Sequence, residues 1–177
     1  MMHRRSIYID MDGVVADFEE RVSEILGRKI GWGVSDLTKA DWDKVTENQQ
    51  LYRDLPLITE SVKMVGLCRG FSHMFNVSFL TAIPREATMP SSRADKTYWL
   101  NKHFPGMEIN FGPFSRDKQR YCKPFDLLID DKPENIEQWV SKGGCAIHHT
   151  GKTAKDYEKT IKNIIQAIDF PESKIYC

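Results

Sequence analysis

Two pairs of aspartates follow apolar, strand-like runs of this sequence. Asp10 and Asp12 lie in YIDMDG, and Asp130 and Asp131 lie in LLIDDK. Aspartates after strands often cap helices, but the carboxyl ends of parallel strands meet at one edge of a sheet, where two such pairs would repel each other. Clustered carboxylates with few histidines suit a hard cation. The sequence therefore predicts a Mg²⁺ site at that edge.

A threonine and a lysine accompany these acids. Thr81 ends the apolar run VSFLT, where its hydroxyl can donate a hydrogen bond to a phosphate oxygen. Lys118 lies in SRDKQ, just before LLIDD, and can neutralise a phosphate and keep an aspartate ionised. Gly13 supplies the unusual backbone angles with which a chain turns around a bound ion or phosphate. Together these residues predict a phosphate site beside a cation.

Short β-rich runs alternate with longer segments of helical spacing along the chain. The alternation predicts an α/β fold whose mostly parallel sheet is covered by helices on both faces. The expected strands are residues 6–10, 77–81, 108–111, 126–130 and 145–149.

Boundary signals mark four of the expected helices. An apolar stripe within residues 18–26 is followed by Gly27, which is typical of a helix end. Ser92 and Thr153 are each followed three positions later by an aspartate, Asp95 and Asp156, which is typical of a helix start. Pro133 suits the first turn of another helix.

One region interrupts the alternation of strands and helices. From about residue 27 to residue 57 the chain has helical character over residues 38–52 and no convincing strand. We expect a small, mostly helical insertion between the first strand and the rest of the sheet. The core is then residues 1–15 and 75–177, and the insertion with its flanking helices is residues 16–74.

The composition restricts the classes of partner. Lysine plus arginine number 25 and aspartate plus glutamate number 25, whereas a broad nucleic-acid surface needs a surplus of positive charge. Apolar stretches are far shorter than the roughly 20 residues that span a bilayer, and the N-terminal residues do not resemble a signal peptide. We expect a cytoplasmic protein. The four cysteines are far apart in sequence, which indicates reduced thiols rather than a zinc site.

The order of the motifs resembles a known superfamily. DMDGVVADF, the threonine of FLTAIP, the lysine of SRDK and the aspartates of LLIDDKPEN are similar, in that order, to the four motifs of the haloacid dehalogenase-like phosphohydrolases. The sequence is most similar to their 5′(3′)-deoxyribonucleotidase branch, where the first motif also continues into ADF. The resemblance implies a three-layer, Rossmann-like fold with a small helical cap inserted after the first strand.

The resemblance also implies roles for the acidic residues. Asp10 is the expected nucleophile that forms an aspartyl-phosphate, and Asp12 is the expected acid and base for the leaving group and water. Mg²⁺ would be held by Asp10, the backbone carbonyl of Asp12, and Asp131. Asp130 would either bind the cation through water or orient Lys118.

Further residues are expected to contact the substrate. The phosphoryl oxygens would be held by Thr81, the amide of Ala82, and Lys118, with Arg116 and Lys96 as further cations. A nucleobase would stack on one or more of Phe18, Trp32, Trp42 and Tyr52. Two features depart from the branch: the span from Asp10 to Thr81 is shorter than in the animal enzymes, and Ala82 stands where serine is usual.

The motifs thus predict a Mg²⁺-dependent phosphatase acting on nucleoside monophosphates, with deoxyribonucleoside 5′- or 3′-monophosphates as the expected substrates. Three alternatives stay open: a phosphatase for another small phosphate ester or a nucleic-acid 3′-phosphate, a phosphoacceptor signalling domain, and a binding module. Receiver domains place their acids before the threonine and lysine, whereas the second acidic pair follows Lys118 here. No nucleic-acid or membrane partner is expected, and a homodimer is left open.

Overall fold

A six-stranded sheet forms the middle layer of the molecule, with the strand order β3-β2-β1-β4-β5-β6. Every neighbouring pair of strands is parallel. The strands are β1 (Ser6–Ile9), β2 (Asn76–Ala82), β3 (Glu108–Gly112), β4 (Leu127–Asp130), β5 (Cys145–His148) and β6 (Ile175–Tyr176). The five strands predicted from the sequence are confirmed, and β6 is an addition at one edge.

This computed structural model describes residues 4–31, 34, 36–48, 50–84, 88–112, 114–170 and 175–176. Trp32, one of the expected stacking residues, lies outside the described residues. Within the described part of the chain, no helix combines the length and the apolar character that crossing a membrane requires.

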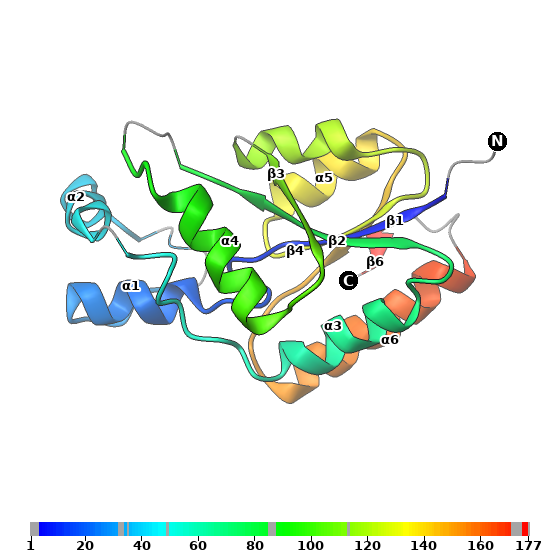
Figure 1. The fold of residues 1–177 in the computed structure, drawn as a ribbon, viewed down its shortest axis with the longest axis horizontal. Coiled ribbons are helices and arrows are strands. Elements are labelled where there is room, and N and C mark those ends of the chain that lie inside the picture. The colour runs from blue at the N-terminus through cyan, green and yellow to red at the C-terminus, as the bar shows by residue number, and fades with distance from the viewer. Residues whose placement is uncertain are drawn as a thin grey trace.

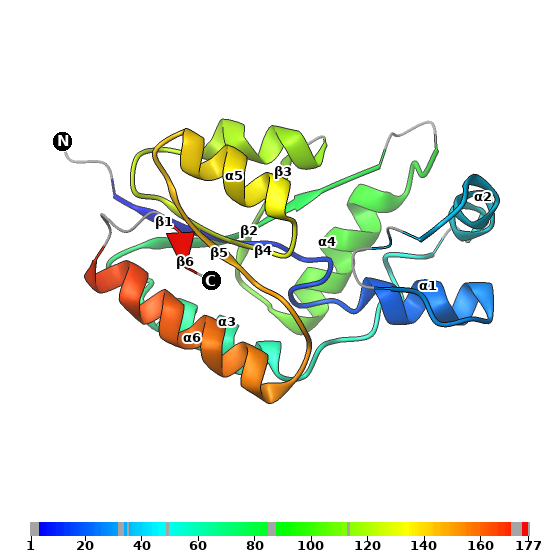
Figure 2. The ribbon, with the colours of Figure 1, turned by 180° about the vertical axis from the view of Figure 1, so that it is seen from behind.

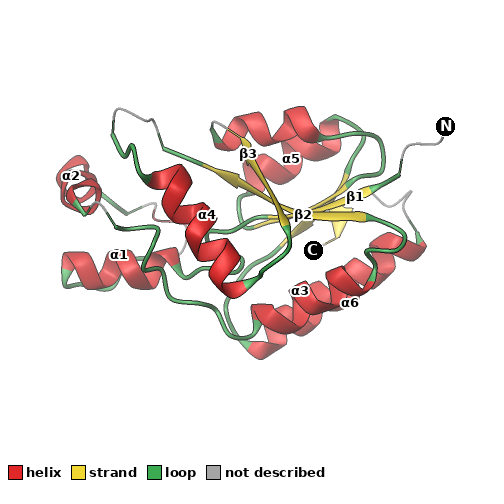
Figure 3. Ribbon diagram, viewed as in Figure 1, coloured by secondary structure: helices red, strands yellow, loops and turns green. Residues whose placement is uncertain are grey.

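Helices cover both faces of the sheet (Figure 1, Figure 2). One face carries α3 (Ser61–Gly70) and α6 (Ala154–Asp169), which contact each other, together with α4 (Ser92–His103). The other face carries the 3₁₀ helix η2 (Ser115–Tyr121) and α5 (Pro133–Ser141). Figure 3 shows the resulting three layers, with the yellow strands between red helices. The three-layer α/β architecture is therefore confirmed.

The central strands are apolar on both faces because both faces are covered. Side chains alternate along a strand, so Ile7 and Ile9 pack into the larger core cluster beneath α3, α4 and α6. Leu80 and Leu128 point the other way and join Trp139 of α5 in a smaller cluster. This two-sided burial explains why these runs lack the polar alternation of a half-exposed sheet.

Two helices lie beyond the carboxyl ends of the strands, on the left of Figure 1. They are α1 (Phe18–Leu26) and α2 (Lys39–Glu47), and they contact each other. The chain leaves and returns through two adjacent segments that pair at Ala16 and Leu57. The amide of Asp17 donates to the carbonyl of Pro56 at 2.8 Å, which holds the two crossings together.

The helix boundaries largely follow the sequence signals. Gly27 ends α1 in a left-handed conformation with φ 66°, and Pro133 occupies the first turn of α5. α4 begins close to the expected position, but its N-cap is Ser91 and no side-chain cap hydrogen bond forms there, so the predicted pairing of Ser92 with Asp95 is wrong. The Asp95 carboxylate, however, accepts from Arg53 Nη1 at 3.3 Å, which ties α4 to the segment after α2.

The start of α6 offers a test of local stability. Thr153 and Asp156 form a capping box, in which each side chain accepts from the other residue's backbone amide. We expect Thr153→Ala to lower the free energy of unfolding by about 1 kcal/mol in urea titrations, because the Asp156 amide loses its side-chain acceptor. Thr97→Ala is the matched control, since its hydroxyl only donates to the Arg93 carbonyl within α4. Equal effects of the two variants would contradict the capping role.

Candidate active site

Three aspartates from neighbouring strands converge at the carboxyl edge of the sheet. Asp10 follows β1, while Asp130 and Asp131 end and follow β4, which pairs directly with β1. The backbone amide of Asp10 donates to the carbonyl of Ile129 at 2.9 Å, so the ladder itself fixes their spacing. One carboxylate oxygen from each aspartate lies within 4.8 Å of the others, and all three side chains are buried.

Lys118 of η2 is the cation at the centre of this cluster. Its Nζ lies 2.6 Å from Asp10 Oδ1 and 2.7 Å from Asp130 Oδ2, and only 2% of its side chain is exposed. Burial alone would lower the pKa of Lys118, but the two carboxylates outweigh burial and raise it. Lys118 is therefore charged at neutral pH. The expectation that Asp130 orients this lysine agrees with the contact.

Asp130 is held by more partners than the sequence motifs indicated. Asn135 Nδ2 of α5 lies 2.9 and 3.0 Å from its two oxygens, and the Lys132 amide donates to Oδ1 at 2.9 Å. Ser115 Oγ in turn donates to Asn135 Oδ1 at 2.9 Å. Sequence reasoning missed Asn135, because an asparagine in the first turn of a helix is usually an exposed polar residue and its pattern predicts no role in a site.

The arrangement fits a divalent cation. Asp131 Oδ1 is buried and has no hydrogen-bond partner among the described residues. Burial, followed by repulsion from neighbouring carboxylates, raises the pKa of both Asp131 and Asp10. Lys118 supplies one positive charge against three carboxylates, so a cation would relieve the remaining repulsion. All three aspartates could hold such an ion, but both oxygens of Asp130 already accept hydrogen bonds, whereas Asp131 Oδ1 has no partner among the described residues.

A second ion pair lies beside the cluster. Lys96 of α4 forms an ion pair with Asp12 Oδ2, and its Nζ also lies 3.0 Å from Thr81 Oγ1 and 2.8 Å from the Ala82 carbonyl. Burial, only partly offset by Asp12, lowers the pKa of Lys96. The structure thus brings Asp12 and Lys96 to the adjacent residues Thr81 and Ala82 at the end of β2.

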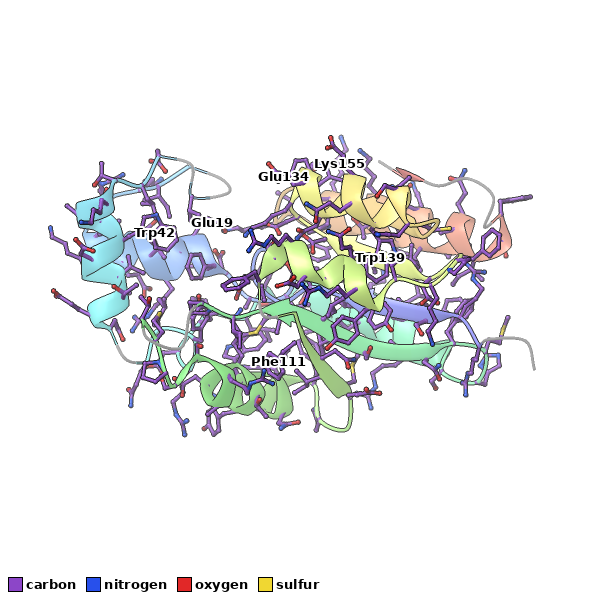
Figure 4. The ribbon with its side chains drawn as sticks, turned by 90° about the horizontal axis from the view of Figure 1, so that it is seen from above. Glu19, Trp42, Phe111, Glu134, Trp139 and Lys155 are labelled. Carbon is purple, nitrogen blue, oxygen red and sulfur yellow. The ribbon has the colours of Figure 1, made fainter. Side chains whose placement is uncertain are left out.

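A cavity of about 280 Å³ opens above these charges. Asp10, Asp12, Lys96, Lys118 and Asp131 line its base, together with Ala82. Its upper wall is aromatic: the Phe18 ring stacks on Tyr52 at 5.9 Å between centroids and on Trp42 at 6.4 Å. Figure 4 shows Trp42 and Glu19 at the α1–α2 end of the molecule, far from Trp139 in α5. Three of the four expected stacking residues therefore share one wall.

Arg116 lies elsewhere than its predicted role as a phosphate contact would suggest. Arg116 is exposed on η2, with its guanidinium 5.4 Å from the Phe114 ring, and is not among the residues that line the cavity. His148 and His149 point apart, as adjacent strand residues do. His148 Nε2 lies 3.0 Å from the Asp131 carbonyl, and His149 Nδ1 lies 2.8 Å from Thr160 Oγ1.

The family can now be assigned. Residues 4–164 match the model of a family described as 5′ nucleotidase, deoxy (Pyrimidine), cytosolic type C protein. The chain belongs to this nucleotidase family. It is therefore a phosphoric monoester hydrolase, and the predicted relationship to the deoxyribonucleotidases is confirmed.

Individual relatives agree with this nucleotidase assignment. Two Staphylococcus aureus proteins, from strains MSSA476 and MW2, are each 26% identical over 153 residues and are named "Putative 5'(3')-deoxyribonucleotidase". The match covers 77% of this chain and 78% of each relative. A crystal structure of a dehalogenase superposes with a TM-score of 0.53 at 11% identity, covering 86% of this chain and 88% of that one. This likeness confirms the dehalogenase-like fold.

Gly13 gives a test of how tightly this nucleotidase packs its carboxylates. Its φ is 76°, and a Cβ there would overlap Asp131 Oδ2. Gly106 has φ 80° with open space around it, so Gly106→Ala matches the backbone strain without the overlap. We expect both alanine variants to lose stability, but only Gly13→Ala to weaken Mg²⁺ binding in calorimetric titrations. Equal cation affinity in the two variants would contradict the packing described here.

The raised pKa of Asp131 predicts a pH dependence in the cation-free protein. The folded state holds the carboxyl proton more tightly than the unfolded state does, so folding gains stability at low pH. That gain should be lost as pH rises from about 3.8 through the folded-state pKa. Urea titrations in a chelator should show this fall in the wild type and a smaller one in Asp131→Asn. A wild type that instead becomes more stable, relative to Asp131→Asn, as pH rises would refute the predicted direction.

Proposed function

We propose that this nucleotidase is a Mg²⁺-dependent phosphatase that hydrolyses deoxyribonucleoside monophosphates through an aspartyl-phosphate. The observation that carries the proposal is the pairing of a buried carboxylate cluster with an aromatic wall across one cavity. The cluster suits a cation and a phosphate, and the aromatic wall suits a planar base. The names of the Staphylococcus aureus relatives support the same substrate class.

Asp10 would act as the nucleophile. The Met11 amide donates to Oδ1 at 2.8 Å and Lys118 Nζ contacts the same oxygen, so two donors fix the orientation of the carboxylate. Holding the nucleophile in one orientation removes much of the entropic cost of the reaction. The bond from Asp10 to phosphorus forms as the bond to the sugar oxygen breaks, and water later releases phosphate.

Lys118, Asp131 and Asp12 would complete the reaction centre. When bound, Mg²⁺ supplies charge neutralisation between the anionic nucleophile and the anionic phosphate. Asp10, the backbone carbonyl of Asp12, and Asp131 would hold it, while Lys118 would stabilise the phosphoryl oxygens. The Asp12 carboxyl would give its proton to the leaving sugar oxygen and then accept one from the attacking water.

The segment with α1 and α2 would form the cap, within the proposed boundaries of residues 16–74. Phe18 is the central ring of the aromatic wall, and Trp42 is 37% exposed, so a face of the wall is open to the cavity. A base stacked there would place its phosphate toward Asp10. Base–aromatic stacking contributes roughly 1–3 kcal/mol, which is enough to favour nucleotides over simple phosphate esters.

A substrate panel tests this function. Phosphate release should be measured on deoxyribo- and ribonucleoside 5′- and 3′-monophosphates and on glycerol phosphate, each with Mg²⁺ or with chelator. We expect Mg²⁺-dependent turnover that is fastest on one or more deoxyribonucleotides. Absence of turnover on every nucleotide, with activity on glycerol phosphate, would instead support a phosphatase for another small ester.

The nucleophile has its own test. Asp10→Asn should fold, because an amide can still accept from Met11, but its phosphate release should fall below detection. Asp169→Asn, an exposed substitution at the end of α6, is the matched control and should keep wild-type turnover. Undiminished activity in Asp10→Asn would refute the assignment.

A further inference from the structure

The ammonium group of Lys96 is surrounded by hydrogen-bond acceptors of the protein. Only 1% of the side chain is exposed, although Lys96 is one of the residues that line the cavity. An ammonium has three N–H donors, and three acceptors surround this one: Asp12 Oδ2, Thr81 Oγ1 and the Ala82 carbonyl. The Tyr52 ring covers a further side, with its centroid 4.4 Å from Nζ. In this arrangement no donor of Lys96 is left for a phosphate oxygen.

Asp12 is the partner that this enclosure fixes most strongly. Its Oδ2 is tied to Lys96, whereas its Oδ1 is buried without a hydrogen-bond partner among the residues described. Asp12 also lines the cavity. The ion pair therefore occupies one carboxylate oxygen of Asp12 and leaves the other without a hydrogen-bond partner in the described part of the site.

The two buried lysines of the site contact different carboxylates. Lys118 contacts Asp10 and Asp130, while Lys96 contacts Asp12. Thr81 and Ala82 end β2. The contacts of Lys96 with these two residues therefore link the Asp12 side chain to the sheet. A charge buried at this depth is costly unless it is paired, so the pairing with Asp12 is the main reason it can stay there.

We propose that Lys96 is a positioning residue for Asp12, and not a phosphate ligand. The inference rests on the proposed function, in which the Asp12–Lys96 pair holds one transferable proton. Asp12 passes that proton to the leaving oxygen as the Asp10–phosphorus bond forms, and the attacking water later returns a proton to the pair. Without Lys96, the carboxyl group of Asp12 would rotate away from the leaving oxygen. The sugar would then have to depart as a poorly stabilised alkoxide.

Leaving-group dependence separates positioning from phosphate binding. A nucleotide needs a proton on its leaving oxygen, whereas 2,4-dinitrophenyl phosphate releases a stable phenolate without one. We expect Lys96→Met to lower kcat/KM for a deoxyribonucleotide by about 100-fold, since placed acids contribute that much, and for the aryl phosphate by less than about threefold. kcat/KM is the right measure, because it reports the first phosphoryl transfer and not the later attack of water.

Control variants guard against a folding defect. Lys102→Met changes an exposed lysine of the same helix and should alter neither rate. Lys96→Gln keeps two N–H donors for Asp12 and should recover part of the nucleotide rate. It also serves as the test variant if Lys96→Met does not fold, as judged by circular dichroism. Equal losses on both substrates would overturn the proposal.

Binding of inorganic phosphate provides a second, independent arm. The double variant Asp12→Asn/Lys96→Met removes both charges of the pair, so the net charge of the site is unchanged. We expect its affinity for phosphate, measured by calorimetry with Mg²⁺, to lie within about threefold of the wild type, whereas loss of a direct ligand would cost about tenfold or more. This arm needs no turnover. If the wild type hydrolyses no nucleotide, the proposed function fails, while phosphate affinity still decides whether Lys96 is a ligand.

Discussion

Repulsion among three buried carboxylates is the constraint on which the rest of the site depends. Asp10, Asp130 and Asp131 cannot move apart, because β1 and β4 are neighbours in one ladder. The surrounding elements therefore supply what the ladder cannot: η2 brings Lys118, and the first turn of α5 brings Asn135. The contacts of Lys118 and Asn135 at this edge offset the repulsion between carboxylates that the strand order brings together. A bound cation would offset the repulsion that remains.

The second ion pair couples this charged base to the apolar wall above it. Lys96 contacts Asp12 on one side and the face of Tyr52 on the other, and Tyr52 stacks on Phe18. The Lys96 ammonium, shared between a carboxylate and an aromatic ring, therefore joins the charged base of the cavity to its aromatic wall. Because the same ammonium contacts both, a change in the wall that moves Tyr52 would also disturb Asp12.

Much of this arrangement was predictable from local sequence patterns. Alternation of apolar runs located five strands, and motifs at their ends identified the three clustered aspartates and Lys118. The sequence could not reveal Asn135 or the enclosure of Lys96, because both depend on how α4, α5 and η2 pack against the sheet. Arg116 shows the converse limit, since a cation two residues from Lys118 faces solvent on the turn of η2. Spacing along a helix or strand is local, whereas the direction a side chain faces is set by its tertiary neighbours.

The paired crossings at Ala16 and Leu57 have a consequence for the length of the segment between them. Everything between them leaves and re-enters the core at nearly one point, where the Asp17 amide meets the Pro56 carbonyl and the Ile58 amide meets the Val15 carbonyl. Since the ends are already closed, the entropic cost of lengthening or shortening the segment grows only slowly with its length. The segment between the crossings can therefore change in length at little entropic cost, while the pairing of β1 with β4 stays the same.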